Sequence, residues 1–174
     1  MQVSGYMYPC ALEPAAGSGF LPSISCWGWA TWDRAWRLYD GTLAAWDAIL
    51  RDPPARRSFD MEGAYDYSGM IERVRAGKLE SWGVIWYLSV FSCGGLVLYP
   101  RKSLVSNTGF DGSGTHADHR TRNMIGAVSL WDAQGQFQFP ERVETDRQYY
   151  SESRRLILGS QMGWRSWLRR FIRR

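Results

Sequence analysis

The hydrophobic positions of this chain follow helical periods in most segments and strand-like runs in a few. The segment Ser81–Phe91 is apolar on almost every side, which predicts a buried helix. Amphipathic spacing together with start and stop signals predicts further helices. They are Thr31–Tyr39 with Thr31 as N-cap, Thr42–Leu50, the second half of Phe59–Ala76, Val143–Leu158 and Trp164–Arg174.

Strands are fewer in this pattern, and polar or glycine-rich stretches separate them. The predicted strands are Gln2–Tyr8, Leu96–Tyr99, Met124–Ser129 and Gln136–Phe139. Loops are expected at Glu13–Ser23 and Asn107–Arg120, with a turn or strand end at Ile24–Trp29. Mixed strands and helices of this kind predict an α/β chain with a few-stranded sheet and several helices.

Composition fits one domain with a substantial core, since hydrophobic residues make up 45% of the 174 residues. Ten tryptophans are unusual, and tryptophan serves either as core or as a flat ligand platform. The net charge of +4 is concentrated at the C-terminus, so no broad nucleic-acid-binding face is expected. Three cysteines without C-x-x-C spacing indicate reduced cytosolic thiols. Neither a signal peptide nor a membrane-spanning segment is predicted.

The segment Cys26–Trp36 is the first with candidate chemistry. Gly28 allows either a tight turn or close approach of a ligand to the backbone. An indole face offers apolar contact to a sugar ring, and the Asp and Arg nearby can bond its hydroxyls. The candidate ligand-binding residues are Trp27, Gly28, Trp29 and Trp32. The alternative is that these tryptophans fill the core.

The segment Asn107–His116 is the second. Its glycines leave backbone N–H groups free to face an anion such as a diphosphate. His116 can ligate a divalent metal or bond a phosphate oxygen, and Asp111 can act as acceptor or base. The candidate ligand-binding residues are Asn107, Gly112, Ser113, Gly114 and Thr115. A glycine-rich surface loop with a solvated histidine is the alternative.

Three ordered motifs resemble bacterial family-2-type glycosyltransferases. They are W-G-W-A-T-W-x-R-A-W at 27–36, S-W-x-x-x-W-Y at 81–87 and L-Y-P-x-x-x-L-V-x-N-x-G-F-D-G-S-G-T-H at 98–116. With the opening V-S-G-Y-M-Y-P, the resemblance covers about Val3 to His116. It implies a GT-A fold, whose Rossmann-like N-terminal half binds the sugar nucleotide and a metal. The C-terminal half of that fold carries the acceptor site and the catalytic base.

The chain departs from the family because the N-terminal half, with its D-x-D-type metal motif, is absent. Residues 1–160 are therefore expected to form the acceptor-side part of the domain, with 161–174 as a basic amphipathic helix. The opening strand is expected at a sheet edge that the other half covers. That half is either a separate chain or lost from a truncated gene, and it would share the divalent metal, Mn²⁺ or Mg²⁺, with His116.

The resemblance also suggests a catalytic base. Glu80 stands just before the buried helix, whose N-terminus favours the ionised carboxylate. Trp82, on that helix, is a further candidate for substrate binding. Asp111 is the rival base, and for each acid a plain cap or loop carboxylate is the alternative.

The C-terminal residues have the pattern of an interfacial helix. Apolar residues recur at helical spacing with the arginines on the other face: Trp164, Trp167, Leu168, Phe171 and Ile172. Such a helix favours an anionic membrane surface. The alternatives are packing on the domain or a frayed tail.

These expectations combine into one function. A hexosyl-type glycosyltransferase would move a sugar from a nucleotide-diphosphate sugar to a carbohydrate or lipid-linked hydroxyl acceptor, in bacterial cell-envelope polysaccharide or glycolipid synthesis. We expect a cytoplasmic location, peripheral on the inner face of the cell membrane, and weak sugar-nucleotide binding by this chain alone. The alternatives are a non-catalytic carbohydrate-binding or pseudoenzyme remnant, and a membrane-surface interaction protein.

Overall fold

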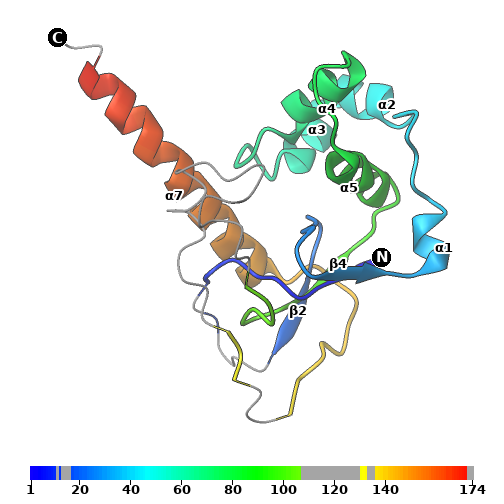
Figure 1. Ribbon diagram of the computed structural model, residues 1–174, viewed down its shortest axis with the longest axis vertical. Coiled ribbons are helices and arrows are strands. Elements are labelled where there is room, and N and C mark those ends of the chain that lie inside the picture. The colour runs from blue at the N-terminus through cyan, green and yellow to red at the C-terminus, as the bar shows by residue number, and fades with distance from the viewer. Residues whose placement is uncertain (11, 13–16, 107–129, 133–135, 172–174) are drawn as a thin grey trace.

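The protein is a mixed α/β chain built on a four-stranded open sheet (Figure 1). The computed structural model describes residues 1–10, 12, 17–106, 130–132 and 136–171, with only the backbone of residues 160–171. The strands are β1 (Gln2–Ser4), β2 (Ser18–Leu21), β3 (Trp29–Thr31) and β4 (Val97–Pro100). The helices are α1 (Asp33–Trp36), α2 (Trp46–Arg51), α3 (Pro53–Phe59), α4 (Tyr67–Arg75), α5 (Trp82–Ser92) and α7 (Arg147–Phe171).

Strand β1 lies inside the sheet, whose order is β2-β4-β1-β3. It runs parallel to β4, with Gln2 opposite Val97, and antiparallel to β3, with Gln2 opposite Thr31. The expected edge position of the opening strand is therefore wrong, because both of its sides are paired within this chain. The edge strands are β2 and β3.

Strand β2 forms within Glu13–Ser23, where the sequence predicts a loop. Glycine and serine weaken the local preference for a strand, but antiparallel pairing with β4 supplies the partner. Gly19 is needed here, because a Cβ on it would lie 2.9 Å from a carboxylate oxygen of Asp146. In contrast, Gln136–Phe139 forms no strand, so that prediction is wrong. The predicted strand Met124–Ser129 lies outside the described residues.

Because of side-chain hydrogen bonds, the first two helices begin later in the chain than the sequence predicts. Thr31 belongs to β3 and its hydroxyl donates to the carbonyl of Met1 over 2.8 Å, so it does not cap α1. The carboxylate of Asp40 accepts from the N–H groups of Thr42 and Ala44 over 2.8 and 2.9 Å. These bonds hold a turn where the sequence predicts helix, and α2 begins only at Trp46.

The last helix is one continuous element. Asp146 accepts from the N–H of Tyr149 over 3.0 Å, so α7 starts at Arg147 rather than at Val143. It then runs without a break to Phe171, and the prediction of a separate helix from Trp164 is wrong. Figure 1 shows α7 leaving the body of the molecule at the side away from α2–α5. Within the described part of the chain, no helix is long and apolar enough to cross a lipid bilayer.

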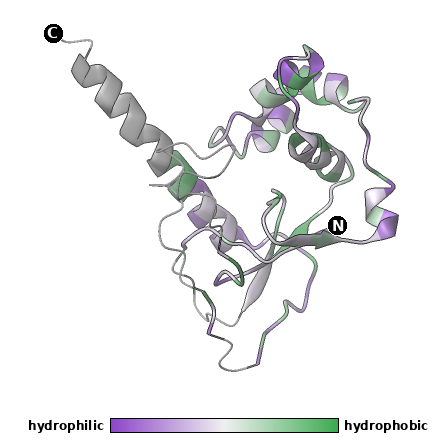
Figure 2. Ribbon diagram, viewed as in Figure 1, coloured by the Kyte–Doolittle hydropathy of each residue, from purple (hydrophilic) through white to green (hydrophobic). Residues whose placement is uncertain are grey.

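Helix α5 confirms the prediction of a buried helix. Ser81 caps it by accepting from the N–H of Val84, and its side chains from Trp86 to Val90 are buried. Figure 2 shows hydrophobic residues along α5 and β4, with hydrophilic residues on the outer helices. The indole N–H of Trp86 donates to Oε1 of Gln2 over 2.7 Å, and Nε2 of Gln2 donates to the carbonyl of Ser25 over 2.5 Å. The side-chain amide of Gln2 therefore connects β1 with Ser25, in the segment before β3, and with α5.

Buried tyrosines fill the space between the sheet and the helices. The hydroxyl of Tyr87 donates to the carbonyl of Phe59 over 2.9 Å, and that of Tyr99 to the carbonyl of Ser23 over 3.0 Å. Burial raises the pKa of Tyr8 to about 12 and the pKa values of Tyr87 and Tyr99 above their usual range. The folded core therefore accepts these side chains only as neutral phenols.

We expect Gln2→Leu to lower the free energy of unfolding by about 2–4 kcal/mol. The leucine would leave the indole N–H of Trp86 and the carbonyl of Ser25 without this partner, and each lost partner costs about 1–3 kcal/mol. Urea denaturation measures the change. Gln148→Leu, at an exposed position of α7, is the matched control and should change stability by less than about 0.5 kcal/mol. Equal losses for the two variants would contradict the role given to Gln2.

We also expect stability to fall at alkaline pH. In the unfolded chain a tyrosine ionises near its ordinary pKa of 10.0, whereas the pKa of the partly buried Tyr8 is raised to about 12 in the folded protein. The unfolded state therefore loses protons first, so stability is full below about pH 10 and declines as pH rises through about 12. Denaturant unfolding at a series of pH values, with phenolate absorbance recorded in parallel, tests this. Constant stability while all phenols titrate together near pH 10 would be the opposite result.

Candidate functional site

Gly28 places the tryptophan segment against the residues that lead into the glycine-rich segment. Its φ is +54°, and its carbonyl accepts from the N–H of Gly5 over 2.6 Å. A Cβ on Gly28 would lie 2.8 Å from a methyl carbon of Val105. The N–H of Leu104 in turn donates to the carbonyl of Gly5 over 2.7 Å. The close approach at Gly28 is thus one of backbone and side chain within the chain.

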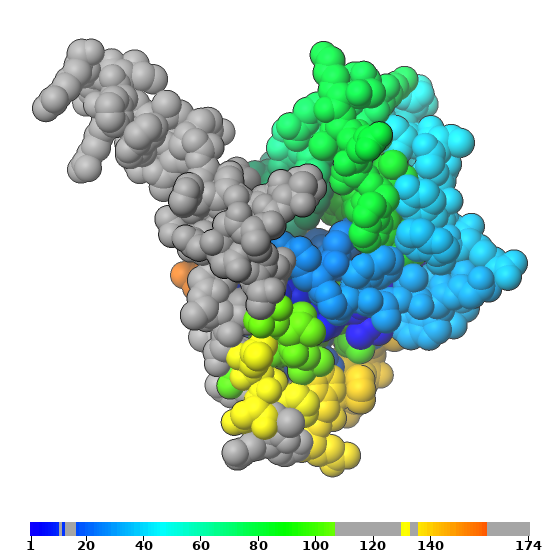
Figure 3. Space-filling model, in the orientation of Figure 1, coloured from blue at the N-terminus to red at the C-terminus, as the bar shows by residue number. Residues whose placement is uncertain are grey.

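Three tryptophans next to this junction form one surface, which we call the aromatic surface: Trp29, Trp36 and Trp82. Trp29, on β3, stacks on Trp82, the first residue of α5, with 5.4 Å between ring centres and 26° between planes. The ring centre of Trp36 lies 6.0 Å from that of Trp29. Trp36 and Trp82 are 42% and 47% exposed, so neither ring is enclosed in the core. Figure 3 shows the segment before α1 and helix α5 adjoining on the viewed face.

A buried ring supports this surface from below. Trp86 is fully buried, and its ring centre lies 5.1 Å from that of Trp36 and 6.4 Å from that of Trp29. The bond to Gln2 fixes the indole of Trp86. The exposed rings therefore rest on a rigid base, which is what a ligand platform requires.

The remaining candidate tryptophans point elsewhere. Trp27 packs edge to face on Tyr6, with 4.6 Å between ring centres. Trp32 is 44% exposed and lies under the guanidinium of Arg34, 5.0 Å from its ring centre. Sequence reasoning grouped four tryptophans, whereas the structure stacks Trp29 with Trp82 and adds Trp36. The spacing of Trp32 and Trp36, one helical turn apart, was the available signal for Trp36.

Glu80 lies where the resemblance places a base. It is exposed, directly before Ser81, the N-cap of α5, and two residues before Trp82. Cys26 approaches the same end of α5, because a Cβ on Gly83 would lie 2.9 Å from its sulfur. Desolvation of this sulfur raises its pKa to about 11, although the residue as a whole is exposed.

The other predicted residues cannot be placed beside this group. Asn107, Asp111, Gly112, Ser113, Gly114, Thr115 and His116 lie outside the described residues. The same holds for the side chains of Trp164–Arg174. In the part of the chain that is described, no group of three or more His, Cys, Asp or Glu side chains could hold a metal ion.

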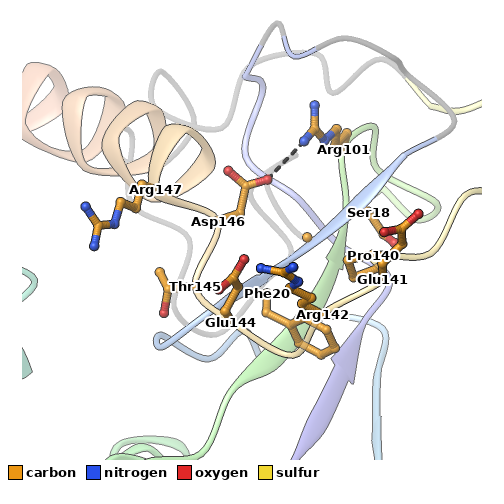
Figure 4. Close-up of a pocket in the computed structure, with 11 residues that line it drawn as sticks. Ser18, Phe20, Arg101, Pro140, Glu141, Arg142, Glu144, Thr145, Asp146 and Arg147 are labelled. Atoms are coloured by element: carbon orange, nitrogen blue, oxygen red, sulfur yellow. Dashed lines mark hydrogen bonds and ion pairs between the residues drawn. The ribbon is translucent and has the colours of Figure 1, made fainter.

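Sequence reasoning missed a hollow of about 790 Å³ on the outer side of β2 (Figure 4). Its walls come from β2, from Arg101 after β4 and from residues 140–147 before and at the start of α7. Their local composition is ordinary, and only the fold brings them together. Comparisons of this chain with protein-family models, curated proteins and solved structures found no match.

We expect Gly28→Ala to destabilise the protein more than Gly77→Ala does. Both glycines have positive φ, +54° and +65°, but a Cβ on Gly77 would meet nothing within 4 Å. The clash with Val105 should add about 1–3 kcal/mol to the backbone strain that the two variants share. Chemical denaturation of both variants measures the difference. Adding Val105→Ala to Gly28→Ala should recover part of the loss, and equal losses for the two glycine variants would disprove the packing role.

Proposed function

We propose that this chain forms the acceptor-side part of a GT-A glycosyltransferase. It would help transfer a hexosyl group from a nucleotide-diphosphate sugar to a hydroxyl of a carbohydrate or lipid-linked acceptor, in bacterial cell-envelope synthesis. A nucleotide-binding half, on sequence outside this chain, completes the enzyme in this proposal. The proposal rests on the motif resemblance together with the geometry around Gly28.

The contact between Gly28 and Val105 is the observation that carries the proposal. It joins the W-G-W segment to residues 103–106, which run directly into Asn107–His116. The two motifs that resemble the family are far apart in sequence, and their ends meet in space. That meeting supports the proposal of a shared site for both motifs, and the aromatic surface lies at the same junction through Trp29.

The proposed chemistry assigns a role to each candidate. Glu80 accepts the proton of the acceptor hydroxyl as that oxygen attacks the anomeric carbon, and the bond to the diphosphate breaks. Asp111 is the rival for this role. The aromatic surface holds the acceptor sugar through its C–H face. A divalent metal, Mn²⁺ or Mg²⁺, with His116 among its ligands, would balance the charge of the leaving diphosphate.

Binding without catalysis is the second candidate function. Rings that are 42% and 47% exposed on a rigid base suit a carbohydrate-binding protein equally well. Such a protein would bind the acceptor and never transfer a sugar to it. Attachment to an anionic membrane through Trp164–Arg174 is compatible with either function, because α7 stays helical to Phe171 and so keeps the period on which that contact depends.

We expect sugar transfer when a nucleotide-binding GT-A half is supplied as a separate chain with UDP-sugars and Mn²⁺. Glu80→Gln should lower the turnover number by about 100-fold or more and leave acceptor binding intact, because a general base contributes about that factor. Glu152→Gln, on α7, is the matched control. Transfer to mixed acceptors is followed by mass spectrometry, and Asp111→Asn tests the rival base in the same assay. His116→Ala should weaken metal-dependent donor binding.

The acceptor site is tested in the same assay. Trp82→Ala should raise the KM for the acceptor up to about tenfold, the loss of one ring contact, with little change in fold. Leu38→Ala removes an apolar side chain of similar exposure, 49%, and serves as the control. Acceptor binding without transfer in every setting would support the carbohydrate-binding alternative. Neither binding nor transfer would remove both functions.

A further inference from the structure

The hollow beside β2 is a second candidate ligand site, separate from the aromatic surface. Ser18, Gly19 and Phe20 of β2 form one wall, and Arg101 another. The chain from Pro140 to Arg147 forms the third wall. At about 790 Å³ the hollow is within the size range of small-molecule sites in proteins.

Three contacts hold these walls in place. Arg101 and Asp146 form an ion pair of 3.0 Å, drawn as the dashed line in Figure 4, with side chains only 19% and 20% exposed. The N–H of Asp146 donates to the carbonyl of Phe20 over 2.9 Å. The hydroxyl of Ser18 donates to the carbonyl of Gln138 over 2.7 Å. The walls are therefore connected to one another before any ligand arrives.

The charges of the hollow cancel. Arg101 and Asp146 neutralise each other, which leaves two arginines and two glutamates exposed along the third wall: Glu141, Arg142, Glu144 and Arg147. An anion would meet both glutamates, and a cation would meet both arginines. A neutral ligand rich in hydroxyl groups suits the glutamates and the arginines alike, because a hydroxyl can donate to a carboxylate and accept from a guanidinium.

Aromatic side chains stand in the chain directly before the third wall of the hollow. Trp131, Phe137 and Phe139 form what we call the aromatic ladder, with ring centres 5.4 and 5.2 Å apart. Phe139 directly precedes Pro140 of the hollow and is 69% exposed. The three rings pack edge to face on one another, and the exposed ring of Phe139 offers the flat apolar contact that the C–H face of a sugar residue needs.

We propose that the hollow and the aromatic ladder bind a neutral oligosaccharide chain. One sugar residue places its hydroxyls among Arg142, Glu144 and Glu141, and the next residues lie along Phe139 and the ladder. This ligand class follows from the charge balance and the rings of the hollow itself. The further step, that the bound chain is the acceptor glycan held at a distance from its reacting end, rests on the proposed function.

Isothermal titration calorimetry with defined hexasaccharides tests the proposal. The neutral probes are cellohexaose, maltohexaose, laminarihexaose and chitohexaose, and the anionic probe is hexagalacturonate. We expect at least one neutral probe to bind more tightly than hexagalacturonate. Arg142→Ala and Phe139→Ala should each weaken that binding about tenfold, as expected for one lost charged hydrogen bond or ring contact.

Two variants serve as matched controls. Val143 stands between Arg142 and Glu144, is 77% exposed and does not line the hollow, so Val143→Ala should leave affinity unchanged. Leu38→Ala removes an apolar side chain that is 49% exposed and does not line the hollow, so it should also leave the affinity for the hexasaccharide unchanged. All four substitutions are at partly or fully exposed positions, and circular dichroism checks that the fold is retained.

Several results would overturn the proposal. They are no binding of any neutral probe, tighter binding of hexagalacturonate, or an affinity that Leu38→Ala lowers and Phe139→Ala does not. The readout is binding alone, so it is independent of transfer. Hexasaccharide binding without any transferase activity would uphold this site while rejecting the proposed enzyme.

Discussion

The side-chain amide of Gln2 lies at the centre of the sheet and is 1% exposed. Its nitrogen donates to Ser25, just before the W-G-W segment, and its oxygen accepts from Trp86 on α5. The aromatic surface takes one ring from each of these parts, Trp29 from the first and Trp82 from the second. Because an amide has both a donor and an acceptor in a fixed geometry, it sets the distance between the two parts. The stacking of the exposed rings depends on that spacing, and hence on a residue that no ligand would touch.

The elements that the sequence predicts well are those decided by their own residues. Helix α5 is apolar throughout and has Ser81 at its start, and β4 is a short apolar run, so local pattern is enough for both. Strand β2 was missed because its preference comes from pairing with β4, far along the chain. The central position of β1 is likewise decided by distant partners. The end of α7 was also not predicted, since the sequence pattern predicts two helices, Val143–Leu158 and Trp164–Arg174, where the structure has one continuous helix.

The candidate site divides in the same way. The motif resemblance brought Trp29 and Trp82 into one group, and the structure stacks them. The sequence left a tight turn or close approach of a ligand open for Gly28, and the structure shows a positive φ with the side chain of Val105 packed against it. The hollow beside β2 had no sequence signal, because Ser18, Arg101 and Glu144 stand far apart in the sequence and only the fold brings them together. Sites of that kind are found from geometry, whereas tryptophan-rich sites also appear in the sequence.

The parallel pairing of β1 with β4 has a consequence for how the chain folds. These neighbours are joined through a long excursion that contains α1–α5, and Trp86 bonds to a residue 84 positions before it. Pairing β1 with β4 at the centre of the sheet therefore closes a large loop of chain. Forming this pairing costs the conformational entropy of closing that loop. Sheet and helices then unfold as one cooperative unit. Destabilising any helix between β1 and β4 therefore also weakens the pairing of these two strands. Contacts so distant in sequence also make slow folding the rule for such a topology.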